Sequence, residues 1–316
     1  MQADWIGGEF VISQAPLGVQ VRIKQSLFDE AAKLVKDMLS LNVVSVKALQ
    51  SLVGKLSNIA NLLVVWRPFL APLFAALYAP TASGAPPNCV WVKQISSELS
   101  WFQAFFSASG GFVERHFDLQ CFTATDTIVD VVLDASPWGL AGVLTVNDQP
   151  VEFFAEAITP HDVDTFDHTI GDAAGQQVWE CLAALIAVRL WRNRWQKHQV
   201  CLRIRGDSVA MLTLLVNMRP HSAQMRLIAQ EIAIDMAHYT FVPVIAQHIP
   251  GIANVVADEL SRWAQPGHVQ KLPHYVQPPV TRVFPPSRSH QYYLTKAGLP
   301  SPSRRNKGDI GASSAS

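Results

Sequence analysis

The sequence predicts an α/β fold in which a small helical subdomain precedes a mixed five-stranded sheet with the element order βββαβααβα. Three observations predict it: helical periodicity before residue 62, three short apolar runs between 127 and 158, and a long apolar helix pattern after them. The chain has 316 residues, 49% of them hydrophobic, and this is enough to bury one sizeable core and a smaller one.

The helical part begins with two amphipathic segments. The segment "LFDEAAKLVKDMLSL" carries apolar residues on one face, and Ser45 is the predicted N-cap of a second helix. The apolar positions are Leu27, Ala31, Leu34, Val35, Met38 and Leu39, then Leu49, Leu52, Val53, Leu56 and Ile59. The stretch "APTASGAPPN" (79–88) has the composition of a connector, and a further helix is expected at about 92–106.

The strands follow in a regular order. "TIVDVVLDA" (127–135), "GLAGVLTVN" (139–147) and "PVEFFAEAI" (150–158), separated by turn signals, predict an antiparallel meander. A long helix at about 173–195, a strand at 199–207, two helices, a strand at 239–249 and a last helix from about 252 complete the order.

Two segments are predicted to lie outside this core. "TPHDVDTFDHTIGD" (159–172) contains Asp162, Asp164, Asp167 and His168, which could hold a metal, but acidic, turn-rich text is more typical of a solvated loop. Residues 268–316 are rich in proline, serine and basic residues and predict a disordered tail, so deleting everything after Gly267 should leave stability nearly unchanged.

Composition limits the class of protein. The formal net charge is zero, which neither favours nor excludes a nucleic-acid partner. The most apolar run (61–78) is broken by Arg67, Pro68 and Pro72, so no membrane span is expected, and no signal peptide is evident. The cysteines lack paired spacing and indicate a reduced intracellular protein, cytoplasmic or nuclear and not secreted. They are Cys89, Cys121, Cys181 and Cys201.

Four isolated carboxylates stand at the ends of predicted strands or on helices. Asp134 closes the first strand and Asp207 the fourth, and these strands are neighbours in the expected sheet. Glu180 on the long helix and Asp258 on the last helix can reach the same edge, although Asp258 is equally explained by its place in the first half of a short helix. Converging carboxylates repel one another unless cations neutralise them, and such oxygen ligands suit two ions of Mg²⁺ or Mn²⁺.

These residues occur in motifs that resemble ribonuclease H as carried by retroelement reverse transcriptases. "VLDASPWGLAGVL" resembles its first hairpin, "WECLAALIA" its catalytic helix, "IRGDS" its third acid and "HIPGIANVVADELSR" its closing segment. The resemblance implies a ribonuclease H-like fold, Asp134, Glu180, Asp207 and Asp258 as catalytic and metal-binding residues, and the RNA strand of an RNA–DNA hybrid as substrate.

Residues beside the acids are candidates for substrate contact. We expect Ser136, Trp138, Gly139 and Asn254 to contact the hybrid, because its 2′-hydroxyls are recognised by small polar groups and backbone amides. His248 is interpreted as a packed histidine rather than a proton shuttle, and "RLWRNRWQK" (189–197) as mostly structural.

A weaker resemblance covers the N-terminal part. "WIGGEF" and the segment 49–74 resemble the end of the palm and the thumb or connection region of gypsy-like or DIRS-like reverse transcriptases. No Asp-Asp dipeptide occurs, so the polymerase aspartates, palm and fingers are expected upstream in the same polyprotein. The expected divisions are a thumb/connection-like region and linker (1–88), a connecting helix and entry segment (89–120), the ribonuclease H-like domain (121–267) and the tail (268–316).

Two other functions remain open. A catalytically inactive ribonuclease H fold could serve as a connection or nucleic-acid-binding module, although the presence of all four acids argues against it. A small-molecule enzyme is disfavoured because no glycine-rich phosphate loop follows a strand.

Overall fold

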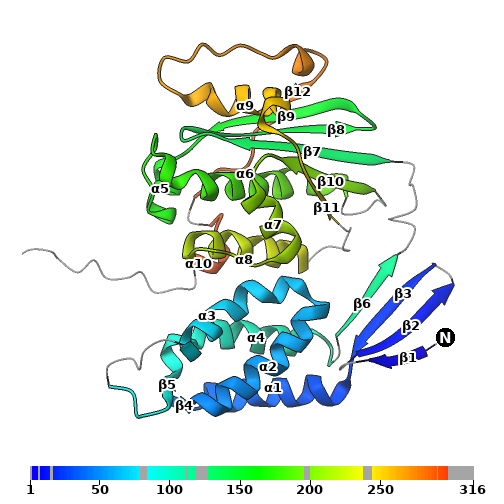
Figure 1. The fold of residues 1–316 in the computed structure, drawn as a ribbon, viewed down its shortest axis with the longest axis vertical. Coiled ribbons are helices and arrows are strands. Elements are labelled where there is room, and N and C mark those ends of the chain that lie inside the picture. Colours follow the sequence, from blue (N-terminus) through cyan, green and yellow to red (C-terminus); the bar gives the residue numbers. More distant parts are fainter. Residues whose placement is uncertain are drawn as a thin grey trace, which may run out of the picture.

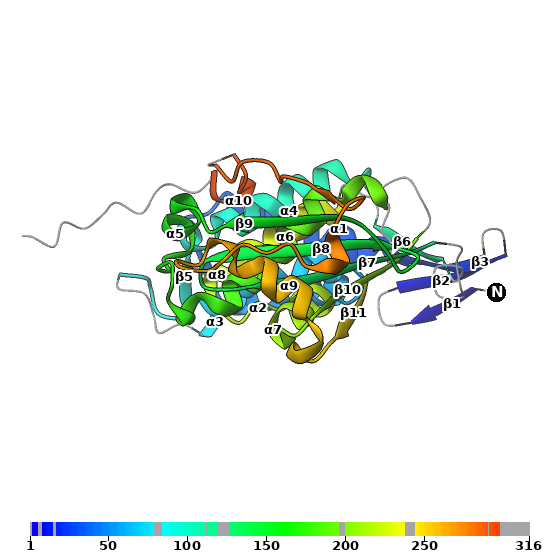
Figure 2. The ribbon, with the colours of Figure 1, turned by 90° about the horizontal axis from the view of Figure 1, so that it is seen from above.

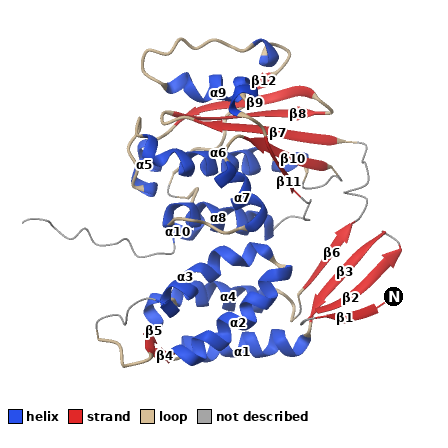
Figure 3. Cartoon of the chain, in the orientation of Figure 1, coloured by secondary structure: helices blue, strands red, loops and turns tan. Residues whose placement is uncertain are grey.

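The computed structural model describes residues 2–5, 8–14, 17–78, 84–111, 113–118, 127–195, 200–237, 244–289 and 291–297. They form two regions that pack against each other (Figure 1). The N-terminal region is a group of helices with a small sheet beside it, and the second region is a larger sheet with helices on both faces (Figure 3).

The helices of the N-terminal region enclose their own core. Ser45 caps the second helix as predicted, since its hydroxyl accepts a hydrogen bond from the Ala48 amide at 3.2 Å. Trp66 is fully buried at the centre and contacts the rings of Phe102 and Phe106 edge to face. The helices are α1 (Gln25–Leu39), α2 (Val46–Leu62), α3 (Arg67–Tyr78) and α4 (Ser96–Ala108), and the strands β4 (Val43–Ser45) and β5 (Cys89–Trp91) form a two-stranded ladder.

An antiparallel sheet that the sequence did not predict extends from these helices. Its order is β1 (Gln2–Trp5), β2 (Gly8–Gln14), β3 (Leu17–Ile23) and β6 (Glu114–Asp118). The pairing of β3 with β6 joins segments more than 90 residues apart, and Glu114 accepts hydrogen bonds from Gln20 and Arg22 across it. Residues 114–118, expected in a connecting segment, therefore pair with the N-terminal strands.

The larger sheet has the order β11-β10-β7-β8-β9-β12. Its central meander is antiparallel, while β10 is parallel to both β7 and β11, so the predicted topology and the adjacency of the first and fourth strands are confirmed. The strands are β7 (Ile128–Ala135), β8 (Gly139–Val146), β9 (Gln149–Ala157), β10 (Cys201–Gly206), β11 (Val244–His248) and β12 (Thr281–Arg282). The sixth strand, β12, was not predicted.

Helices cover both faces of this sheet. Helices α6 (Gln176–Leu190), α7 (Val209–Asn217) and α8 (Ala223–Ala237) lie on one face, and α9 (Val255–Ser261) lies on the other (Figures 1 and 2). Residues 178–188 of α6 are all buried, because this helix lies between the sheet and α8. The mixed α/β fold with this element order is ribonuclease H-like.

The acidic segment after β9 is the exposed loop that the sequence suggests only in its second half, where residues 169–172 are exposed. It forms α5 (Pro160–Phe166), whose capping box joins Thr159 and Asp162, and a short 3₁₀ turn at Ala173–Gly175. Asp162 is fully buried, because its carboxylate accepts hydrogen bonds from Arg288 and Tyr293. The first half of the segment is therefore a packing element.

The expectation of a disordered tail from residue 268 is wrong for residues 268–289 and 291–297. Strand β12 pairs with the edge strand β9, Val276 is buried against the face that α9 covers, and α10 (Leu294–Ala297) contacts α8. The anchors are single residues at irregular spacing, so no periodic pattern indicated them. Residues 298–316 lie outside the described part.

The two regions meet where α3 packs against α8. Ala233 of α8 belongs to the N-terminal core, and the Gln230 side chain donates to the Pro68 carbonyl at 3.4 Å. Cys89, Cys181 and Cys201 are free thiols, and Cys121 lies outside the described residues. Among the described residues, none of the helices combines the length and apolar character needed to cross a membrane.

Candidate metal centre

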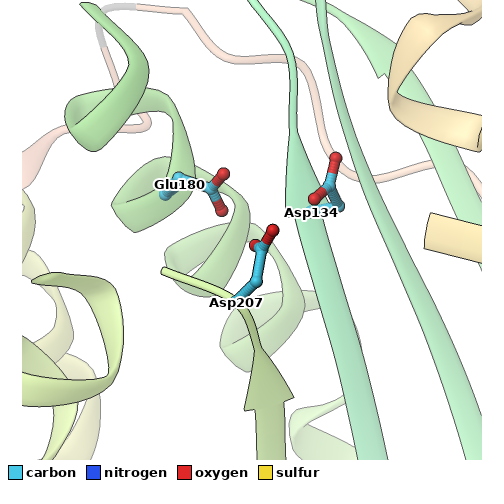
Figure 4. Close-up of side chains that lie close together, drawn as sticks. All are labelled: Asp134, Glu180 and Asp207. Carbon is cyan, nitrogen blue, oxygen red and sulfur yellow. The ribbon is translucent and has the colours of Figure 1, made fainter. Parts of the chain in front are cut away.

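Three of the four predicted acids converge at one edge of the sheet. Asp134 extends from β7, Glu180 from α6, and Asp207 follows β10 directly (Figure 4). One oxygen of each carboxylate lies within 4.8 Å of the others. Asp134 and Glu180 are 4% and 5% exposed, and Asp207 is half-buried.

The sheet register explains why they meet. Strands β7 and β10 are parallel neighbours with Val132 opposite Arg205, so Asp134 and Asp207 emerge two residues later at the same edge. Helix α6 packs on β7 and β8 and presents Glu180 to this edge. The convergence therefore follows from the crossover connection through α6.

Asp134 and Glu180 each accept a hydrogen bond at one carboxylate oxygen, while the other oxygen has no partner. Gln176, one turn before Glu180, donates to Glu180 Oε1 at 3.0 Å, and Asn254 donates to Asp134 Oδ1 at 3.2 Å. Within the described part of the chain, Asp134 Oδ2 and Glu180 Oε2 are buried without any hydrogen-bond partner. Buried polar atoms are normally paired, and these two oxygens belong to converging acids, so both are available to bind a cation.

Electrostatics support the same conclusion. Burial, together with the negative charges of Asp207 and Asp258, raises the pKa of Asp134 to about 7, against the lowering effect of the nearby Ser261 hydroxyl, which donates to the Asp258 carbonyl at 2.9 Å. Burial together with Asp134 and Asp207 raises the pKa of Glu180 well above its ordinary value. The carboxylates need protons or a cation to stay together, and hard oxygen donors fit a divalent cation such as Mg²⁺ or Mn²⁺.

The structure does not bring Asp258 into this group. Its half-exposed carboxylate accepts hydrogen bonds from Arg262 Nε at 3.0 Å and from Nη2 at 2.6 Å, four residues further along the chain. The charge of Asp258 is nevertheless close enough to raise the pKa of Asp134. The ion pair, which follows from i,i+4 spacing, explains why the fourth acid stands apart.

Two predicted substrate contacts are interior residues instead. The Ser136 hydroxyl donates to the Ser261 carbonyl at 2.7 Å and accepts from the Gly139 amide at 3.1 Å, and the side chain is 3% exposed. A Cβ on Gly139 would lie 2.5 Å from the Ser261 carbonyl oxygen, so this glycine permits close packing of β8 on α9. Both residues fix the turn after Asp134, and direct contact of either residue with the substrate stays a prediction.

The other two predicted contacts differ from each other. Asn254 is 2% exposed and donates to the Leu133 carbonyl at 3.0 Å as well as to Asp134, so it positions the acid. Trp138 is half-buried beside Gly171 and stays a candidate contact. His248, predicted to be packed, is exposed because it ends β11 at the sheet edge.

The basic motif 189–197 is structural where it is described. Arg189 forms ion pairs with Glu231 and Asp235, and Arg194 with Glu152. Trp191 and Trp195 are 2% and 6% exposed. Lys197 lies outside the described residues.

Sequence reasoning missed two residues that shape the centre. Gln176 precedes Glu180 by four residues, a spacing that places both side chains on one face of a helix, and this signal was available. Gly251 is the second, since a Cβ there would lie 3.0 Å from Asp207 Oδ2. Its close approach depends on how the β11 end meets β10 and has no local signal.

No family model and no curated protein matches the chain. Among solved structures it is similar to LC11-RNase H1 isolated from compost, with 17% identity and a TM-score of 0.32 over 45% of this chain and 96% of that one. It is also similar to the foamy viral protease-reverse transcriptase with RNA/DNA hybrid (12%, TM-score 0.28, 79% of this chain) and with dsDNA (14%, 0.26, 79%). The chain spans 30% and 45% of those two chains, and likeness at this level carries no conclusion about activity.

Proposed function

We propose that this chain is a metal-dependent endoribonuclease that cuts the RNA strand of RNA–DNA hybrids. We assign it to the ribonuclease H portion of a retrotransposon reverse transcriptase, gypsy-like or DIRS-like, with the polymerase palm and fingers in the same polyprotein. The observation that carries the proposal is the group of Asp134, Glu180 and Asp207, in which two buried oxygens lack partners.

In this proposal the three acids hold the cations, and their neighbours fix which oxygen is offered. Asn254 occupies Oδ1 of Asp134 and leaves Oδ2 free, while Gln176 occupies Oε1 of Glu180 and leaves Oε2 free. Bound Mg²⁺ or Mn²⁺ supplies the Lewis acidity for phosphodiester hydrolysis. Asp258 is the proposed fourth acid, and it reaches the centre only after leaving Arg262.

The proposal is tested with Asp134→Asn. Wild type with Mg²⁺ or Mn²⁺ should cut end-labelled RNA in a hybrid and spare double-stranded DNA, and the variant should bind the hybrid but cut it only at the uncatalysed background. The substitution keeps the size of the side chain and removes the charge that holds cations. Asp164→Asn, the same change at an exposed residue of α5, is the control and should cut like wild type.

The same experiment also tests the alternative, a catalytically inactive module. If folded wild type binds the hybrid and does not cut it with either metal, the enzyme proposal fails. A non-catalytic nucleic-acid-binding or connection module then becomes the better interpretation of the fold.

A further inference from the structure

Two arginines meet at the junction between the two regions of the molecule. Arg67 begins α3, and its Nη1 donates at 3.0 Å to the carbonyl of Asn217, the last residue of α7. Arg219 follows two residues later and is exposed. Arg219 therefore lies two residues from the carbonyl that Arg67 contacts, and burial and the positive charge of Arg219 both lower the pKa of Arg67.

These two charges are not compensated by the protein. Within the described ranges, neither Arg67 nor Arg219 has an acidic oxygen within 4.0 Å. Exposed His221, two residues beyond Arg219, adds no negative charge. By contrast, seven other arginines among the described residues form ion pairs, namely Arg22, Arg189, Arg194, Arg203, Arg262, Arg282 and Arg288.

A pair of close, unneutralised guanidinium groups is complementary to a phosphate. Guanidinium donors match phosphate oxygens in geometry, and like charges this close are stabilised by an anion between them. Arg67 is already oriented by the Asn217 carbonyl, which lowers the entropy lost on binding.

The position of Arg67 and Arg219 indicates that the phosphate belongs to the backbone of a bound duplex. Helix α7 begins two residues after Asp207 and ends at Asn217 beside Arg67, and its nine residues span roughly 13 Å. That length corresponds to about four phosphates along the axis of one strand. A duplex that lies on the carboxylates with its axis along α7 would therefore reach the junction within half a helical turn.

We propose that Arg67 and Arg219 form a phosphate-binding site for the backbone of the bound duplex, built jointly by the helical region and the ribonuclease H-like region. The inference rests on the proposed function for the identity of the substrate. The site recognises backbone charge and carries no base specificity, so it acts on hybrid and double-stranded DNA alike.

The test is the salt dependence of hybrid binding in EDTA, measured by fluorescence anisotropy with a labelled 20-base-pair hybrid. A lost phosphate contact reduces the slope of log Kd against log salt concentration by about 1. We expect Arg219→Gln to weaken binding and to lower the slope by about that amount, and Arg67→Gln/Arg219→Gln to lower it by about 2. Arg67→Lys should keep most of the slope because it keeps the charge.

The control is Lys36→Gln, which removes one exposed charge from α1, on the side of the helical region away from the junction (Figure 1). It should leave the slope unchanged, and melting temperatures will show that every variant is folded. An unchanged slope in folded Arg219→Gln, or the absence of hybrid binding by wild type, overturns the phosphate site.

Cleavage by wild type with Mg²⁺ is measured separately and keeps the two proposals distinguishable. Normal cleavage with an unchanged slope in Arg219→Gln refutes the phosphate site alone. A reduced slope without any cleavage by wild type refutes the enzyme proposal and supports the phosphate site.

Discussion

The metal centre depends on single hydrogen bonds that fix individual oxygen atoms. Asn254 and Gln176 each occupy one oxygen of a buried acid, and both come from segments outside β7. Without a cation, burial disfavours the negatively charged form of Asp134, whose second oxygen has no partner. This is why the pKa of Asp134 is raised to about 7. The centre therefore costs stability until it binds a ligand.

This cost predicts a pH dependence of stability in EDTA. The folded-state pKa of Asp134 is raised from 3.8 to about 7, so the folded protein binds more protons than the unfolded chain between these values. The free energy of unfolding should then fall as pH rises from about 4 to 7 and level off above. Thermal melts of wild type and Asp134→Asn across this range check it, with a smaller fall expected in the variant. A wild-type melting temperature that rises toward pH 7 relative to the variant would contradict this assignment.

The turn after Asp134 gives a second prediction at this scale. A methyl group at Gly139 would lie 2.5 Å from the Ser261 carbonyl oxygen and 3.0 Å from that of Glu156, both backbone atoms that cannot easily move. Gly139→Ala should destabilise the protein by about 1–3 kcal/mol. Gly54→Ala, in α2 with no atom within 4 Å of the new methyl group, should stabilise it by about 0.5–1 kcal/mol. The free energies of unfolding of both variants, measured in urea, test this prediction. Equal changes in the two variants would refute the packing argument.

At the scale of elements, α5 and the C-terminal segment hold each other in place. Asp162 joins the α5 capping box to Arg288 and Tyr293, while Glu231 of α8 accepts hydrogen bonds from the backbone amide and hydroxyl of Thr295. Arg288 is 6% exposed, so it depends on the Asp162 carboxylate for compensation of its charge.

Removing that carboxylate should release the C-terminal segment. Asp162→Asn leaves a buried, unpaired Arg288, and such a loss typically costs about 3–5 kcal/mol. We expect a lower melting temperature and faster proteolysis within residues 268–297. Asp164→Asn, two residues along the same helix and exposed, is the matched control and should behave like wild type. Equal protection of the segment in both variants would show that the ion pair does not anchor it.

At the scale of the whole molecule, the C-terminal segment completes the larger sheet. Strand β12 covers the edge strand β9, and Val276 fills the core beneath α9. A chain ending at residue 267 should therefore melt at a lower temperature than one ending at residue 297, with a less cooperative transition. Differential scanning calorimetry of the two chains measures both transitions. Coincident transitions would show that residues 268–297 do not contribute to the folded core.

Local patterns in the sequence determined the order of α1, α2 and α4, of the strands β7 to β11 and of the helices α6 to α9, and the positions of the acids. The alternation in 127–158 and the Ser45 cap can each be recognised from a few neighbouring residues. The parallel pairing of β7 with β10 then brings Asp134 beside Asp207. The sequence could therefore predict most of the fold and three members of the metal centre.

Tertiary structure alone decided the rest. The β3–β6 pairing, the Asp162–Arg288 ion pair and the Asn254–Asp134 hydrogen bond join residues 92 or more positions apart, and none leaves a periodic trace in either segment. For Asp258 the sequence motif predicted a place in the metal centre. In the structure its carboxylate pairs with Arg262 instead. Periodicity reports which face of an element is buried, but the partner of a polar side chain depends on which elements pack together.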